Sequence, residues 1–210
     1  MTTPTLDLEN SIAAKHGFAH IAGLDEAGRG ALAGPVVAAA VILPLDDAAA
    51  IQSLHGVNDS KRLTARQREA LFDPIMQHAV AYGIAAVAAD IVDEIGILPA
   101  TRQAMRTAVS QLTPAAQYLL IDGRIRLKTL PTPQQSIIRG DSASLSIAAA
   151  SILAKVTRDR LLIEWDVQFP QYGFARHKGY GTPQHLAALE QHGPCPLHRH
   201  SFAPIKRPLL

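Results

Sequence analysis

The chain has 210 residues and a formal net charge of +2; 48% of the residues are hydrophobic and only 5% are aromatic. This length and composition suit a single globular domain with a core built mainly of alanine, valine, isoleucine and leucine. The only cysteine, Cys195, excludes an internal disulfide and fits a reducing compartment.

The sequence shows no targeting or membrane segment. Its N-terminus lacks a basic region followed by an apolar run, so we expect no secretory signal. The longest apolar run, residues 33–45, is interrupted by Gly34, Pro35 and Pro44 and is too short to span a bilayer. We therefore expect a cytoplasmic protein that does not enter a membrane.

Strand-like and helix-like segments alternate along the chain. Helix starts are indicated by Thr64, Pro99 and the pair Thr182-Pro183. This interleaving indicates an α/β layered fold with one sheet. In chain order we expect a polar lead-in over 1–18, strands over 19–25 and 36–43, a loop over 58–61, a helix over 64–78, a strand over 79–88, a helix over 99–112, strands over 117–121 and 136–139, a long helix from 142 or 144 towards 166, a loop over 169–181 and a helix over 182–192.

Positive charge gathers toward the C-terminus. Residues 155–210 hold eight lysines and arginines against four acids, whereas residues 1–154 hold twelve against fourteen. An acidic body with a basic flank suits a phosphate-rich polymer, because lysine and arginine bind phosphates whatever the sequence. An ordinary uneven surface gives the same distribution, so charge alone leaves both interpretations open.

Four acids stand at or just beyond the ends of short apolar runs. Asp25 and Glu26 close the first predicted strand, Asp122 follows Tyr-Leu-Leu-Ile, and Asp141 follows Ile-Ile-Arg-Gly. Ionised carboxylates are costly to bury unless they are paired or bound to metal, and hard divalent cations favour oxygen ligands. Because acids at strand ends can converge at one sheet edge, the pattern predicts a two-metal site for phosphodiester chemistry.

Each of these acids also has a purely structural explanation. Asp25 and Glu26 would serve as a surface turn pair, and Asp122-Gly123 is a common turn dipeptide. Asp141 would cap the long helix. The coincidence of four such acids favours a site, although each explanation alone is credible.

The loop after the first strand contains Gly28, Arg29 and Gly30. The glycines let the backbone come close to a ligand, and arginine is a natural phosphate partner. Residues 28–33 fit the loose dinucleotide pattern G-x-G-x-x-A, but a strand follows instead of a helix. The chain also lacks Gly-Lys-Ser/Thr, so we reject both the dinucleotide-binding and the Walker-loop interpretations.

Further candidates for phosphate and sugar contacts lie downstream. Ser60 and Lys61 either hold a phosphate or form a plain turn. Lys155 and Arg158, three apart on the long helix, face a phosphate or solvent, with solvent as the default. The loop 172–181 mixes aromatic rings and cations, a combination that grips sugars and bases, and inward-facing tyrosines are the alternative.

Cys195, His198 and His200 stand close together near the C-terminus. A zinc site would need a fourth ligand and usually a paired cysteine spacing, which the sequence lacks. We therefore expect surface or packing roles for these residues.

Together these motifs resemble the signature of bacterial ribonuclease HII, the type 2 ribonuclease H family. The likeness runs in order from about residue 19 through nearly the whole chain and shows no departure at the four acids. The matching runs are 25–30 (DEAGRG), 32–36 (LAGPV), 58–61 (NDSK), 121–123 (IDG), 140–142 (GDS), 149–160 (AASILAKVTRDR), 177–180 (HKGY) and 200–202 (HSF).

The resemblance implies a ribonuclease H-like layered α/β fold, with a central mixed β-sheet flanked by helices and a small C-terminal helical segment. The catalytic domain would cover 19–210, after the polar lead-in 1–18. The implied activity is endonucleolytic cleavage of RNA in RNA–DNA hybrids and on the 5′ side of single ribonucleotides in duplex DNA. The products would carry 3′-hydroxyl and 5′-phosphate ends, as ribonucleotide removal and RNA primer removal require.

The resemblance also implies residue roles. Asp25, Glu26, Asp122 and Asp141 would be the catalytic acids and would hold two Mg²⁺ or Mn²⁺ ions. The loop at residues 28–30 would sense the ribose 2′-hydroxyl, and Tyr180 would stack on the next sugar. The full substrate-binding set is Gly28, Arg29, Gly30, Ser60, Lys61, Lys155 and Tyr180.

Two rival functions are a non-catalytic hybrid-binding protein and an integrase-like DNA nuclease. The four acids argue against the first, and Tyr180 together with the Gly28-Arg29-Gly30 loop argues against the second. We expect a monomer. Because the chain stops soon after Phe202 without a terminal Gln-led aromatic motif, we do not expect recruitment by a sliding clamp through that route.

Overall fold

The computed structural model describes residues 3–205, and its centre is one five-stranded mixed sheet. The strand order is β3-β2-β1-β4-β5. The β1–β2 and β2–β3 pairs are antiparallel, whereas β1–β4 and β4–β5 are parallel. The strands are β1 (Ile21–Ala27), β2 (Val36–Ile42), β3 (Ala81–Val87), β4 (Tyr118–Asp122) and β5 (Gln134–Ile137).

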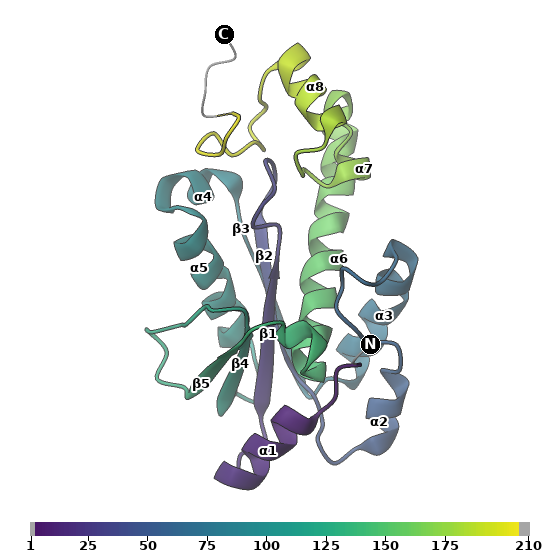
Figure 1. The fold of residues 1–210 in the computed structure, drawn as a ribbon, viewed down its shortest axis with the longest axis vertical. Helices are drawn as coiled ribbons and strands as arrows, with labels where there is room; N and C mark the ends of the chain where they lie inside the picture. Colours follow the sequence, from purple (N-terminus) through teal and green to yellow (C-terminus); the bar gives the residue numbers. More distant parts are fainter. Residues whose placement is uncertain (1–2, 206–210) are drawn as a thin grey trace.

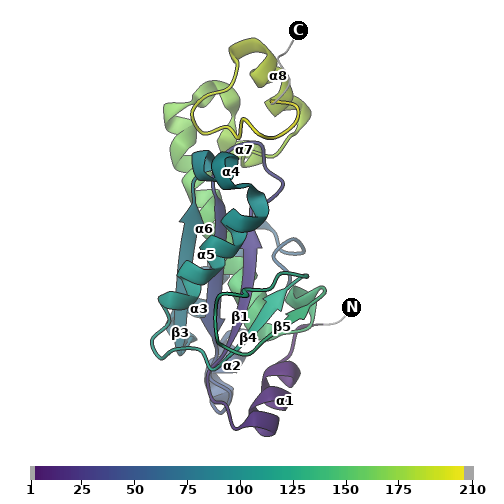
Figure 2. The ribbon, with the colours of Figure 1, turned by 90° about the vertical axis from the view of Figure 1, so that its left-hand side faces the viewer.

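Helices cover both faces of this sheet, as Figure 1 shows with the sheet seen edge-on. The long helix α6 and the helix α3 lie on one face, and α5 lies on the other with α4 at its end. Figure 2 shows α7 and α8 together beyond one end of the sheet. The helices are α1 (Asp7–His16), α2 (Ala48–Ser53), α3 (Ala65–His78), α4 (Ala89–Ile95), α5 (Ile97–Ser110), η1 (Gly140–Ser142), α6 (Leu145–Gln168), η2 (Pro170–Tyr172), α7 (Phe174–His177) and α8 (Pro183–His192).

The central strands are buried on both faces. Every residue of β2 is buried, and alternate residues of its sequence VVAAAVI enter two different core clusters. The small side chains let the helices approach closely: a Cβ on Gly23 of β1 would collide with the backbone at Ser146 of α6. Close packing of this kind fixes the distance between β1 and the start of α6, on which the site depends.

Three helix starts follow the local signals in the sequence. Thr64 and Gln67 form a capping box for α3, and the side chains of Ser144 and Thr182 cap α6 and α8. The predicted α/β fold with a central mixed sheet flanked by helices is confirmed, as are β2, β3 and the last helix.

Other elements differ from the expectation. No separate element was expected at α1, α2, α4, η1, η2 or α7. The fifth strand lies two residues earlier than expected, and α5 begins two residues earlier. Residues 206–210, where a terminal clamp-binding motif would stand, lie outside the described residues. No helix within residues 3–205 is long and apolar enough to cross a membrane.

Candidate active site

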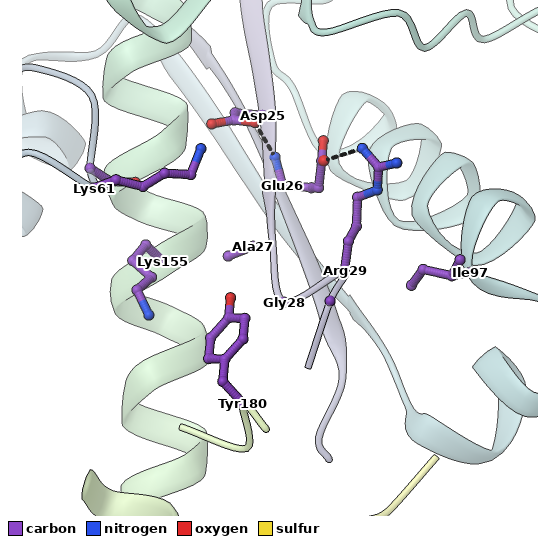
Figure 3. Close-up of a pocket in the computed structure, with 11 residues that line it drawn as sticks. Asp25, Glu26, Ala27, Gly28, Arg29, Lys61, Ile97, Lys155 and Tyr180 are labelled. Carbon is purple, nitrogen blue, oxygen red and sulfur yellow. Dashed lines mark hydrogen bonds and ion pairs between the residues drawn. The ribbon is translucent and has the colours of Figure 1, made fainter. Parts of the chain in front are cut away.

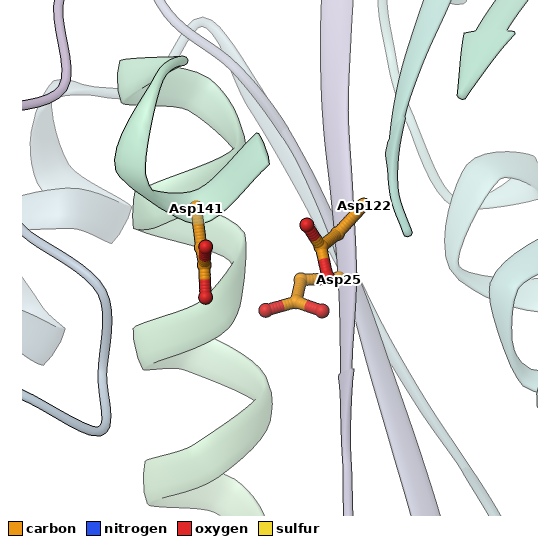
Figure 4. A group of neighbouring side chains, drawn as sticks. All are labelled: Asp25, Asp122 and Asp141. Carbon is orange, nitrogen blue, oxygen red and sulfur yellow. The ribbon is translucent and has the colours of Figure 1, made fainter. Parts of the chain in front are cut away.

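Three of the four predicted acids meet at the carboxyl end of β4, beside the middle strand β1. In the parallel pair β1–β4, Leu24 lies opposite Ile121, so the next residues, Asp25 and Asp122, are neighbours. Asp141 joins them from η1. One oxygen from each of the three carboxylates lies within 4.8 Å of the others (Figure 4). The expected convergence of acids at a sheet edge is therefore confirmed for this acidic triad.

The short helix η1 brings Asp141 to the triad. Asp122 Oδ1 accepts a hydrogen bond of 2.7 Å from the backbone N–H of Gly140, and Arg139 before it is left-handed with φ 57°. The alternative that Asp141 caps the long helix is wrong, because Ser144 is the cap: its side chain accepts from the N–H of Ile147. Asp122 thus ties the segment that carries Asp141 to the end of β4.

The triad concentrates negative charge in a buried place. Asp25 and Asp141 are each only 5% exposed. Burial, followed by the charges of neighbouring acids, raises the pKa of Asp25 well above its usual range and also raises the pKa of Asp141. A bound cation would offset this crowded negative charge, and the oxygen donor set fits hard divalent metal ions.

Glu26 stands apart from the triad. It follows Asp25 in β1, so the two side chains leave opposite faces of the strand. Its Oε1 accepts a 2.9 Å hydrogen bond from Arg29 Nη1, while its Oε2 is buried without a hydrogen-bond partner among the described residues. Burial raises the pKa of Glu26 although Arg29 opposes the shift. The metal-ligand group found among the described residues therefore does not include Glu26.

A pocket of about 480 Å³ opens beside these acids. Figure 3 shows Lys61 and Lys155 on one side of it, Arg29 on the other and Tyr180 below. All seven residues predicted to bind substrate line it, together with Asp25 and Glu26. Ala27 and Ile97, which were not expected there, complete the lining. The predicted set in the lining is Gly28, Arg29, Gly30, Ser60, Lys61, Lys155 and Tyr180.

The Ser60-Lys61 loop is anchored to the helices. The backbone N–H of Ser60 donates to Ser151 on α6, and its carbonyl accepts from Arg68 on α3 at 2.8 Å. Lys61 Nζ lies 3.7 Å from Asp141 Oδ2. Burial lowers the pKa of Lys61, but the surrounding carboxylates outweigh that effect and the net shift is upward. Lys61 is therefore a firmly protonated cation at the pocket rim.

In the loop 172–181, some aromatic rings face inward and one faces the pocket, so each interpretation holds for part of the loop. Tyr172 and Phe174 are buried and pack in an apolar cluster with residues of α6 and α8, as the inward-facing alternative predicted. Tyr180 instead lines the pocket, half-buried, with Lys155 Nζ 5.5 Å and Arg158 Cζ 5.2 Å from its ring centroid. One ring of the loop is thus presented to the pocket while the others hold the loop in place.

The expectation that Lys155 and Arg158 of α6 face solvent is wrong. Arg158 is fully buried and donates to backbone carbonyls, and Lys155 is half-buried and pairs with Asp159 at 2.7 Å. The sequence did not reveal this burial, because both positions carry charges at a spacing that usually marks a solvated face. Arg199, which it did not single out, is equally buried.

The C-terminal cysteine and histidines divide between packing and surface. His198 is buried, its Nδ1 accepts from the N–H of Cys195, and its Nε2 lies 3.0 Å from Nε2 of His185. His200 is exposed. The group found in residues 3–205 with metal-ligand geometry is the acidic triad, not this cluster.

A mixed five-stranded sheet covered by helices, with acids gathered at one edge, defines a ribonuclease H-type, metal-dependent nuclease. The ribonuclease HII family model matches residues 22–205. Ribonuclease HII of Ruminiclostridium cellulolyticum is 57% identical over 190 residues, which cover 90% of this chain and 72% of that protein. The chain therefore belongs to the ribonuclease HII family.

Solved structures agree with this membership. The ribonuclease H2 from Pyrococcus horikoshii has a TM-score of 0.76 at 25% identity, covering 89% of this chain and 95% of its own. Bst-RNase HIII in complex with Mn²⁺ has a TM-score of 0.68 at 19% identity, covering 93% and 71%, and shares the fold. The chain is a metal-dependent ribonuclease, a hydrolase that acts on the RNA strand of RNA–DNA hybrids.

Proposed function

We propose that this enzyme cuts long RNA–DNA hybrids and also cuts on the 5′ side of a single ribonucleotide embedded in duplex DNA, leaving 3′-hydroxyl and 5′-phosphate ends. The observation that carries the proposal is the pocket: Asp25, which belongs to the acidic triad, lines it together with the Gly28-Arg29-Gly30 loop and Tyr180. Chemistry and recognition of one nucleotide can therefore occur together there.

Asp25, Asp122 and Asp141, with Glu26, are the residues that would hold two divalent cations, Mg²⁺ or Mn²⁺. Bound there, such ions supply the Lewis acidity that activates water and stabilises the leaving 3′-oxygen. The chain's own contribution is to fix the carboxylates: Asp122 holds Gly140, and Arg29 holds one oxygen of Glu26. The buried, unpartnered Oε2 of Glu26 supports its place in this set.

Recognition would combine contacts of three kinds. The backbone of residues 28–30 would approach the 2′-hydroxyl, the one group that separates ribose from deoxyribose. Ser60, Lys61 and Lys155 would contact phosphates, which give affinity without sequence preference. The ring of Tyr180 would stack on the sugar that follows the ribonucleotide and favour an RNA–DNA junction. As part of the same proposal, the enzyme acts as a cytoplasmic monomer in DNA repair and replication.

The test is a DNA duplex with one ribonucleotide, labelled at either end, incubated with Mg²⁺ or Mn²⁺ and mapped for the position of the cut. We expect one cut on the 5′ side of the ribonucleotide, none in the matched all-DNA duplex and none in excess EDTA. Binding without cutting would favour the hybrid-binding rival, and equal cutting of the all-DNA duplex would favour the DNA-nuclease rival.

A further inference from the structure

Two arginines are fully buried without an acidic partner. Arg158 and Arg199 are each 0% exposed, and none of the ion pairs found among residues 3–205 includes either of them. A buried charge is normally paired with an opposite charge or bound to a metal, because its desolvation is costly. Their presence in the interior therefore calls for a specific role.

Backbone carbonyls take the place of a carboxylate for both side chains. Arg199 Nε and Nη2 donate to the carbonyl of Gly34 at 3.0 and 2.8 Å, and Nη1 donates to that of Arg29 at 3.0 Å. Arg158 donates through Nε to Pro35, through Nη2 to Ala33 and through Nη1 to Lys178, at 2.8–2.9 Å. Each guanidinium thus donates hydrogen bonds to backbone carbonyls of irregular segments, which would otherwise lack a donor among the described residues.

The hydrogen bonds of Arg158 join the two recognition elements of the pocket, whereas those of Arg199 hold the first element alone. The carbonyls of Ala33 and Pro35 belong to the segment that carries Gly28-Arg29-Gly30, whereas Lys178 lies two residues before Tyr180. Arg158 also lies under the Tyr180 ring, 5.2 Å from its centroid. Backbone bonds reinforce the junction, because the N–H groups of Leu32 and Ala33 both donate to the Gly179 carbonyl.

The fit around Arg158 leaves the loop little freedom. Gly28 has φ +92°, and a Cβ added to it would collide with the Arg158 guanidinium. On the other side, the Arg199 N–H donates to Leu32 and the Gly34 N–H donates to Leu197, both at 2.8 Å. The segment from residue 28 to residue 35 is therefore held by α6 and by the C-terminal turn at the same time.

We propose that Arg158 and Arg199 are positioning residues that together decide which phosphodiester is cut: Arg158 ties the Gly28-Arg29-Gly30 loop to the Tyr180 turn, and Arg199 holds the same loop from the C-terminal side. This inference rests on the proposed function, in which loop and ring contact neighbouring nucleotides. A rigid frame sets the spacing between the two contacts. Lysine cannot replace either arginine, because a single ammonium does not reproduce the planar fork that reaches several carbonyls.

The decisive variant is Arg199→Lys, with Arg160→Lys as the matched control, since Arg160 is exposed and pairs with Glu69 outside the pocket. Both enzymes are compared with the wild type on the single-ribonucleotide duplex and on a duplex with a run of four ribonucleotides. For Arg199→Lys we expect kcat to fall roughly ten- to hundredfold while KM stays within about twofold, because misplacement affects the reaction more than phosphate binding. Cuts in the run should spread over several positions, and the control should behave as wild type.

Melting temperature and Mn²⁺ binding by calorimetry complete the test, since intact Mn²⁺ binding shows that the acids are still in place. An Arg199→Lys enzyme with the wild-type cut position and kcat overturns the inference, as does one whose melting temperature and activities fall together with an unchanged cut position. If Arg199→Lys does not fold, Arg158→Lys is measured in the same way and decides the question. A wild-type enzyme that fails on the lone ribonucleotide contradicts the proposed function itself, whatever the arginine variants do.

Discussion

Asp122 is both a member of the triad and a hydrogen-bond acceptor. Its Oδ1 accepts from the Gly140 N–H, which holds the segment carrying Asp141. An asparagine keeps an oxygen for that bond but loses the charge that a metal ion needs. We expect Asp122→Asn to abolish turnover while hybrid affinity changes little, because affinity rests mainly on phosphate contacts. Hybrid binding in a gel-shift assay and cleavage at millimolar Mg²⁺ check this, and near wild-type turnover would make Asp122 a turn residue only.

Tyr180 offers its ring to the pocket while its backbone N–H donates to the His177 carbonyl. If the ring stacks on a sugar, Tyr180→Ala should lose roughly 1–3 kcal/mol of interaction, or about one to two decades of cleavage rate at the lone ribonucleotide. Tyr180→Phe should keep most of the rate, since the ring makes the contact.

A packing role for Tyr180 predicts a different result. Tyr180→Ala would then lower the melting temperature and would reduce cleavage of the single-ribonucleotide duplex and of the long hybrid equally. Measuring melting temperature beside both substrates separates the two cases. A stable alanine variant with undiminished cutting at the lone ribonucleotide would end the stacking hypothesis.

At the scale of elements, α1 is fastened to the start of α6 by a buried acid. Glu9 is 0% exposed, and its Oε1 accepts from the hydroxyls of Ser144 and Ser146 and from the Ser146 N–H. The Leu145 N–H also donates to the carbonyl of Thr5. A segment that reads as a polar lead-in therefore closes the helix start beside η1, where Asp141 lies.

Removing this acid should destabilise the protein more than it alters the pocket. We expect Glu9→Ala to cost about 1–3 kcal/mol, because two buried hydroxyls and an N–H lose their acceptor. That loss corresponds to a drop in melting temperature of several degrees for a chain of this size. The exposed neighbour Asn10→Ala is the matched control on the same helix, and an equal effect of both changes would show that the Glu9 contacts contribute nothing.

At the scale of the whole molecule, we expect the buried histidines His185 and His198 to contribute to the response to acid. His185 donates from Nδ1 to the Tyr180 carbonyl, so its Nε2 is left to accept the 3.0 Å bond from His198 Nε2, an arrangement that requires both rings to be neutral. Burial lowers the pKa of His185 to about 4 although the bond to the Tyr180 carbonyl opposes the shift, and burial together with His185 lowers the pKa of His198 to about 4.

The sign of the stability change follows from these values. An imidazole in the unfolded chain titrates near 6.5, so between pH 6.5 and about 4 the unfolded chain binds protons that the folded chain does not. The contribution of the two neutral histidines to the free energy of unfolding is therefore lost as the pH falls from 6.5 to about 4. The buried acids at the site act in the opposite direction, because their pKa values are raised.

We expect the drop in melting temperature between pH 7 and pH 5 to be smaller in His198→Gln than in the wild type, although the variant starts lower at pH 7. His55→Gln, at an exposed position, should keep the wild-type dependence. Thermal melts at both pH values check this, and equal slopes in all three proteins would show that the histidine cluster does not govern acid stability.

Local chemistry in the sequence determined the elements that carry the site. Thr64, Ser144 and Thr182 cap helices through bonds to residues three positions ahead, and the apolar runs of β1, β2 and β4 need no distant partner to be recognised. The apolar runs of β1 and β4 lead into Asp25 and Asp122, so the chemistry of the site and the family resemblance could also be predicted from the sequence.

Only the tertiary structure decided which of these groups meet. Asp25 and Asp122 become neighbours because β1 pairs with β4 across almost a hundred residues, and no local signal specifies that pairing. The burial of Glu9, Arg158 and Arg199 has the same origin, because each satisfies polar groups of a segment far away in the sequence. From the sequence alone, a charged residue is predicted to be exposed to solvent. The free energy of burying it depends on hydrogen bonds to distant residues, which only the folded chain supplies.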